Sequence, residues 1–108
     1  HADRSRMTLE QAISEMKLMI LEVTEENYAE YYNRFTAVIL QYHATGGLGE
    51  PLSDQLYELW EANQSDDWKT EVIQDAASQM IGFCIPSQYI KFPDSGSFES
   101  RWSLPYPQ

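Results

Sequence analysis

A chain of 108 residues, 43% of them hydrophobic, is long enough for one domain with a buried core and too apolar to be wholly disordered. Seventeen acidic residues against seven basic ones give a formal charge of −10, which argues against direct binding to nucleic acid or to an anionic membrane, because each phosphate contact needs a cation. A basic partner protein is favoured instead.

The compartment is inferred from what the sequence lacks. Cys84 is the single cysteine and cannot form a disulfide within the chain, so nothing points to an oxidising environment. No run of about 20 apolar residues is present to span a bilayer, and the N-terminus lacks the apolar core of a signal peptide. We therefore expect a cytoplasmic protein.

Residues 1–7 are expected to form a flexible N-terminal arm, or to include a cloning remnant at 1–6 followed by a native start at Met7; the sequence leaves both readings open. Residues 8–108 are expected to form a single helical domain. Thr8 and Gln11 have the spacing of a capping box, which predicts a helix over residues 9–23. Its apolar side chains share one face: Leu9, Ala12, Ile13, Met16, Met19, Ile20 and Val23.

Leu18 and Leu21 fall on the other side of this first helix, so its second half is apolar nearly all round. Burial within the monomer is the favoured interpretation. The alternative is a contact with another chain, in an oligomer that uses this helix.

The stretch from Thr24 to Gly49 predicts one long amphipathic helix around which the domain is organised. Thr24 is the expected N-cap, and Gly46 and Gly47 are expected to end the helix, since glycine adopts the left-handed conformation at little cost. No Gly or Pro separates this helix from the first, so a single bent helix is left open. One apolar stripe runs along it: Tyr28, Tyr31, Tyr32, Phe35, Val38, Ile39 and Tyr42.

Two further helices are predicted after this long helix. Residues 46–51 have the composition of a loop, and Ser53 is the expected N-cap of a short third helix that ends near Asn63. Ser65 or Asp66 then begins a fourth helix, which should end by about Phe83 or Cys84 because Pro86 follows. The expected core side chains of the two helices are Leu56, Leu59 and Trp60, then Val72, Ile73, Ala76, Ala77, Met80 and Ile81.

The C-terminal part lacks helical periodicity. Residues 89–92 lie between two prolines and are expected to be extended or a single edge strand. Phe98, Trp102, Leu104 and Tyr106 are expected to pack on the body or on a partner. The predicted fold is therefore mostly α, a compact bundle of about four helices with an irregular or short extended, aromatic-rich C-terminal segment.

Signatures of enzymes and of metal or cofactor sites are weak. The glycines of residues 46–49 follow a helix and lack a lysine, so they do not suit a phosphate. Cys84 lies between Phe83 and Ile85, where a thiol is usually inert, and His43 is the only base that could serve it. No Glu-x-x-His pair or EF-hand spacing is present. We expect no catalytic residue, metal or cofactor.

Negative charge is the one organised chemical feature. Between Glu50 and Asp75 there are eight carboxylates and one lysine, Lys69. The first acidic row (Asp54, Glu58 and Glu61) lies opposite the core face of the third helix, and the second acidic row (Asp67, Glu71 and Asp75) has i, i+4, i+8 spacing on the fourth, with Trp68 beside it. Like charges at these spacings cost roughly 1–2 kcal/mol together. The predicted partner-binding residues are Asp54, Glu58, Glu61, Asp67, Trp68, Glu71 and Asp75.

The functional hypothesis is a small acidic inhibitor that binds and blocks a basic protein. Its most natural target is the cationic cleft of a nuclease or another nucleic-acid-binding enzyme, as in toxin immunity proteins and phage antagonists, which are analogies of charge and size alone. We expect a monomer or a weak homodimer. The alternative hypothesis is a structural or assembly protein that oligomerises through the first helix and the aromatic C-terminal tail.

Overall fold

The computed structural model of the chain describes residues 7–82 and 86–95. Within them, four helices form a compact bundle and no residue belongs to a β-strand, which confirms the predicted mostly α fold. The helices and the short 3-10 turn that follows them are α1 (Leu9–Ile20), α2 (Tyr28–Ala44), α3 (Gly49–Ala62), α4 (Asp67–Ile81) and η1 (Pro86–Gln88).

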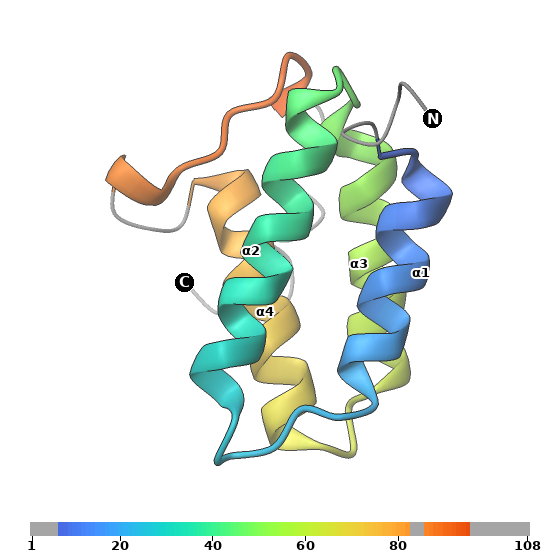
Figure 1. Ribbon diagram of the computed structural model, residues 1–108, viewed down its shortest axis with the longest axis vertical. Helices are drawn as coiled ribbons and strands as arrows, with labels where there is room; N and C mark the ends of the chain where they lie inside the picture. The colour runs from blue at the N-terminus through green and yellow to red at the C-terminus, as the bar shows by residue number, and fades with distance from the viewer. Residues whose placement is uncertain (1–6, 83–85, 96–108) are drawn as a thin grey trace.

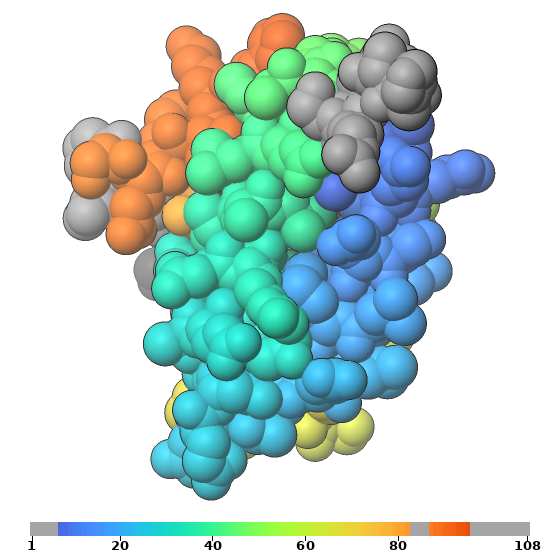
Figure 2. Space-filling model, viewed as in Figure 1, coloured from blue at the N-terminus to red at the C-terminus, as the bar shows by residue number. Residues whose placement is uncertain are grey.

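Consecutive helices run in opposite directions along the long axis of the molecule (Figure 1). The chain therefore forms two helical hairpins, α1–α2 and α3–α4, which stack so that α1 packs on α3 and α2 packs on α4. In the space-filling view α1 and α2 together cover the front of the bundle (Figure 2). Each helix thus buries one face against two neighbours and leaves the opposite face to solvent.

The first helix begins as predicted and ends sooner. Thr8 and Gln11 form the expected capping box, with each side chain bonded to the other's backbone N–H. The helix stops at Ile20, although Val23, beyond its end, is still buried in the core. The prediction that the other face of α1 is buried is wrong for Leu18 and Leu21, which are 68% and 72% exposed because no described element covers that side.

The break between α1 and α2 contains no Gly or Pro, and the side chain of Asn27 forms it instead. Its amide oxygen accepts from the backbone N–H of Thr24 at 2.7 Å, and its amide nitrogen donates to the carbonyl of Glu22 at 2.9 Å. These side-chain bonds satisfy backbone groups that a continuous helix would pair. Two helices result, and α2 begins at Tyr28, one turn later than the predicted cap at Thr24.

The stripe on α2 forms the centre of the core, as predicted. Phe35 and Ile39 are completely buried, whereas Tyr28 and Tyr32 at the start of the helix are only partly covered. At the other end the ring of Tyr42 lies directly on Gly47, where an added Cβ would overlap it, and its hydroxyl donates to the carbonyl of Leu48 at 2.8 Å. Gly46 takes the expected positive φ of 88°.

The start of α3 differs from the prediction. Residues 49–51 form its first turn and not a loop, because Asp94 supplies the cap: its two carboxylate oxygens accept from the N–H groups of Gly49 and Glu50 at 2.8 and 3.0 Å. Pro51 has no N–H and is tolerated in this turn. Ser53, the predicted cap, lies inside the helix and is buried.

The fourth helix is capped by Asp66, one of the two predicted residues, and ends at Ile81. Gly82 ends it by taking a positive φ of 88°, before Pro86 could act. Residues 86–95, which we call the strap, then cross the upper end of the bundle (Figure 1). Residues 89–92 in the strap are irregular, and the predicted edge strand is not formed. Phe92 is buried against Tyr42, and Ile90 is buried as well.

Met7, the last residue of the predicted N-terminal arm, is buried, and its carbonyl accepts from the Thr45 hydroxyl at 3.2 Å. The packed body therefore begins one residue earlier than predicted. The remaining residues of the arm lie outside the described part of the chain, as do Phe98, Trp102, Leu104 and Tyr106 of the tail. In the ranges 7–82 and 86–95, no helix has the length and apolar character needed to cross a membrane.

We expect Phe35→Ala to lower the free energy of unfolding by about 3–5 kcal/mol, because it empties a completely buried aromatic site between α2 and its neighbours. Chemical denaturation followed by circular dichroism measures this loss. Leu18→Ala, on the exposed side of α1, is the control and should change stability by about 0.5 kcal/mol or less. Equal losses in the two variants would contradict the central position of α2.

We expect Asp94→Ala to lower the free energy of unfolding by about 1–2 kcal/mol, because two N–H groups at the start of α3 lose their acceptor. Asp94→Asn keeps one oxygen acceptor and should lose about half as much. Amide hydrogen exchange should accelerate at residues 49–50 in the alanine variant. Unchanged exchange there would show that the strap does not cap this helix.

Candidate functional site

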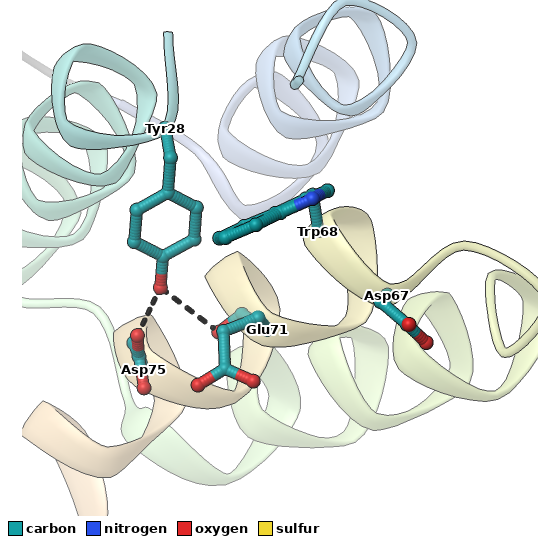
Figure 3. A pocket seen from close by; sticks show the side chains of 5 residues that line it. All are labelled: Tyr28, Asp67, Trp68, Glu71 and Asp75. Atoms are coloured by element: carbon teal, nitrogen blue, oxygen red, sulfur yellow. Dashed lines mark hydrogen bonds between the residues drawn. The ribbon is translucent and has the colours of Figure 1, made fainter. Parts of the chain in front are cut away.

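The second acidic row lies beside a pocket that is lined by aromatic and acidic side chains. This corner pocket has a volume of about 320 Å³ and opens to solvent. Figure 3 shows its walls, which come from the start of α2 and the N-terminal half of α4. Its lining residues are Tyr28, Asp67, Trp68, Glu71 and Asp75.

Helical spacing explains why three of these side chains meet. Trp68, Glu71 and Asp75 stand at i, i+3 and i+7, so they share one face of α4. Tyr28 approaches from the first residue of α2, and its ring meets the indole of Trp68 edge to face, with centroids 5.5 Å apart and planes at 62°. The indole remains 39% exposed, so the pocket has an aromatic corner that water can reach.

The Tyr28 hydroxyl links the two helices. It donates to the Asp75 carboxylate and also lies 3.3 Å from the backbone carbonyl of Glu71 (Figure 3). Burial raises the pKa of Tyr28 far above its ordinary value, and the hydrogen bond to Asp75 raises that pKa further. The phenol therefore acts as a hydrogen-bond donor that joins α2 to Asp75 on α4.

Glu71 is a partly buried carboxylate of the pocket and lies between two other acidic residues of α4. Partial burial raises its pKa, and the neighbouring charges of Asp75 and Asp67 raise that pKa further. No cation in the described residues forms an ion pair with it. Its charge is therefore held at an electrostatic cost, which an incoming cation would relieve.

Lys69, the one lysine of the acidic region, does not neutralise this charge. Its ammonium group donates to the carbonyl of Ile20 at 2.7 Å and lies 3.4 Å from that of Val23. Lys69 thus satisfies carbonyls at the end of α1, where the helix dipole favours a cation. Although Lys69 lies among the carboxylates in the sequence, its side chain extends from the other side of α4 and bonds to the end of α1.

The structure brings only part of the predicted site together. Asp67 lines the rim, but its carboxylate points away from Tyr28 and Asp75 (Figure 3). In the first acidic row Glu58 and Glu61 are exposed and Asp54 is half-buried. As far as the chain is described, none of these three lines the corner pocket, so the two rows do not form one continuous site there.

Tyr28 is the residue that sequence reasoning missed. Its position at the edge of the apolar stripe assigned it to the core, and only its hydrogen bond to α4 shows that its hydroxyl belongs to the acidic face. The sequence does give one signal: Tyr28 begins the stripe, where a side chain can be buried on one side and reach solvent on the other.

The other candidate groups do not form a site among the described residues. The Nε2 atom of His43 lies 2.9 Å from the carbonyl of Lys91, and its ring packs edge to face on Phe92, so it fastens the strap. Cys84, the thiol that the sequence analysis expects to be inert, lies outside the described residues. Over residues 7–82 and 86–95, no group of three or more His, Cys, Asp or Glu side chains is placed to hold a metal ion.

Comparison of the chain with protein-family models, with curated proteins and with solved structures finds no match.

We expect Glu71→Gln to stabilise the fold at neutral pH by about 0.5 kcal/mol, since it removes two like-charge contacts along α4. The folded-state pKa of Glu71 is raised above 4.5, so the ionised carboxylate opposes folding above that pH. The gain should therefore appear as pH rises through the folded pKa and vanish below pH 4 or so. Denaturation at several pH values tests this, with the exposed Glu15→Gln on α1 as the control. A destabilised Glu71→Gln variant would contradict it.

Proposed function

We propose that this protein binds and blocks a basic partner protein through the corner pocket and the second acidic row. The observation that carries the proposal is a 39% exposed tryptophan beside carboxylates that no described cation neutralises. Solvent-exposed indole and repelling charges both work against stability at this place. A cationic surface that covers this place would bury the indole and neutralise the carboxylates, so both features would then favour binding.

The chemistry of such a partner follows from the geometry of the row. Successive carboxylates of Asp67, Glu71 and Asp75 are separated by four residues, or about 6 Å of helical rise. Two phosphate steps along one nucleic-acid strand have a comparable rise of about 7 Å. A cleft that binds nucleic acid is therefore the most natural target, and a nuclease or another nucleic-acid-binding enzyme the most natural partner.

The first acidic row on α3 would act at longer range in this proposal. Glu58 and Glu61 add negative potential on the neighbouring helix, which accelerates encounter with a basic protein without requiring direct contact. The two rows should therefore differ in the kinetic step that they control. The row at the pocket should slow dissociation, and the α3 row should speed association.

A second candidate function is assembly through α1. Leu18 and Leu21 lie one turn apart and are 68% and 72% exposed, which favours contact with another chain. In this case the carboxylates would serve solubility. Light scattering at several concentrations discriminates between the two: a monomer at all concentrations favours the inhibitor, and a stable oligomer that Leu18→Ser/Leu21→Ser dissolves favours assembly.

We expect charge reversal at the second row to weaken partner binding about 100-fold or more, because like charges would then face each other across the interface. The variant is Asp67→Lys/Glu71→Lys, which leaves Asp75 and its bond to Tyr28 intact. Glu58→Lys/Glu61→Lys is the matched control with the same change in net charge. A basic protein captured on the immobilised wild type is purified, and its association and dissociation rates are measured by surface plasmon resonance.

The wild type should bind more slowly as salt rises from about 0.05 to 0.5 M, because the Debye length falls. The α3 control should lose mainly association rate, and the α4 variant should also dissociate faster. The partner's activity on nucleic acid should be inhibited by the wild type alone. Binding that neither reversal nor salt affects would refute the electrostatic inhibitor.

A further inference from the structure

The corner pocket has the form of a receptor for one planar side chain. The rings of Tyr28 and Trp68 meet edge to face (Figure 3). Trp68 is 39% exposed, so part of it is open to solvent. Glu71 stands one turn beyond Trp68 on α4 and also lines the pocket. An aromatic face next to a carboxylate attracts a cation through two interactions at once, the ring quadrupole and the ion pair.

The charges around the pocket determine the sign of its occupant. Tyr28 already donates its hydroxyl proton to Asp75, so that proton is not available to an anion. Lys69 is bonded to the end of α1 and does not fill the pocket from within. Glu71 and Asp75 therefore present negative charge beside the exposed indole.

Elsewhere on this chain an arginine contacts both an aromatic ring and a carboxylate. On α2 the guanidinium carbon of Arg34 lies 4.9 Å from the centre of the Tyr31 ring, and its Nε atom lies 3.8 Å from the carboxylate of Glu30. An aromatic ring and a carboxylate from two adjacent residues thus already contact a guanidinium group on this protein. The corner pocket offers the same two kinds of group, Trp68 and Glu71, at a spacing of three residues, and no arginine of the described residues lines it.

We infer that the corner pocket receives the guanidinium group of an arginine side chain from the basic partner. Arginine fits better than lysine, because its planar group can stack on the indole while it donates two hydrogen bonds to the Glu71 carboxylate. The inference rests on the proposed function, and it names the group of the partner that the pocket recognises. The open mouth of the pocket suits a side chain that protrudes from a convex edge of the partner's cleft.

The test needs no partner protein. Three peptides are titrated into the protein: acetyl-Gly-Arg-Gly-amide, its citrulline analogue, which keeps the shape without the charge, and its lysine analogue. Amide chemical shifts of residues 67–75 report binding at the pocket. We expect the arginine peptide to bind about tenfold more tightly than the citrulline peptide and severalfold more tightly than the lysine peptide.

Matched variants separate the pocket from general attraction by an acidic surface. Trp68→Ala and Glu71→Gln should each weaken binding of the arginine peptide about three- to tenfold, and Trp68→Phe should retain most of it. Glu58→Gln, which removes the same charge from α3, should leave binding unchanged. Circular dichroism verifies that each variant is folded.

Equal binding of the arginine and citrulline peptides would overturn the inference, as would equal binding of the lysine peptide. An equal loss in Glu58→Gln and Glu71→Gln would also overturn it, since attraction would then be diffuse. If the pocket fails these tests while Asp67→Lys/Glu71→Lys still abolishes partner binding, the proposed function stands without the arginine receptor. If the pocket passes while partner binding ignores the reversal, the receptor stands and the inhibitor fails.

Discussion

The apolar stripe of α2 is wider than one neighbouring helix can cover, and the arrangement of the bundle follows from its burial. Phe35 and Ile39 are excluded from water only because α1 packs on one side of α2 and α4 on the other. The ends of the stripe need separate partners. Tyr42 is covered by the strap through Phe92, and Tyr28 lies against α4. The hydrophobic burial that holds the fold together thus also brings Tyr28 to the corner pocket.

Polar contacts at two helix ends join segments that are remote in the sequence. Lys69 on α4 bonds to carbonyls at the end of α1, and Asp94 in the strap bonds to amides at the start of α3. Both contacts supply the charge that a helix terminus favours. They have an electrostatic consequence as well. Since the Lys69 ammonium group is bonded at the end of α1, it forms no ion pair with the carboxylates of α4, and Asp67, Glu71 and Asp75 keep their mutual repulsion.

Some contacts in the corner pocket stabilise the fold, and other features of the pocket do not. The bond from Tyr28 to Asp75 joins two helices and belongs to the fold. The exposure of the Trp68 side chain and the like-charge repulsion at Glu71 work against folding, and a covering cation would relieve both. This contrast is the reason to propose a binding surface on α4. The exposed leucines of α1 are similarly unused by the fold, but they offer no charge or shape that would select a partner.

The number of helices, the buried face of each and the position of the second acidic row could be predicted from the sequence, because they depend on 3.6-residue periodicity and on local caps such as Thr8 with Gln11 and Asp66. The start of α3 could not, because its cap comes from Asp94, some 45 residues further along the chain. Lys69 and Tyr28 likewise act on helices remote in sequence. The sequence therefore showed only a lysine among acidic residues and a tyrosine in an apolar stripe. Periodicity determines which side of a helix is apolar; only packing decides which polar groups meet across helices and which charges are left without a partner.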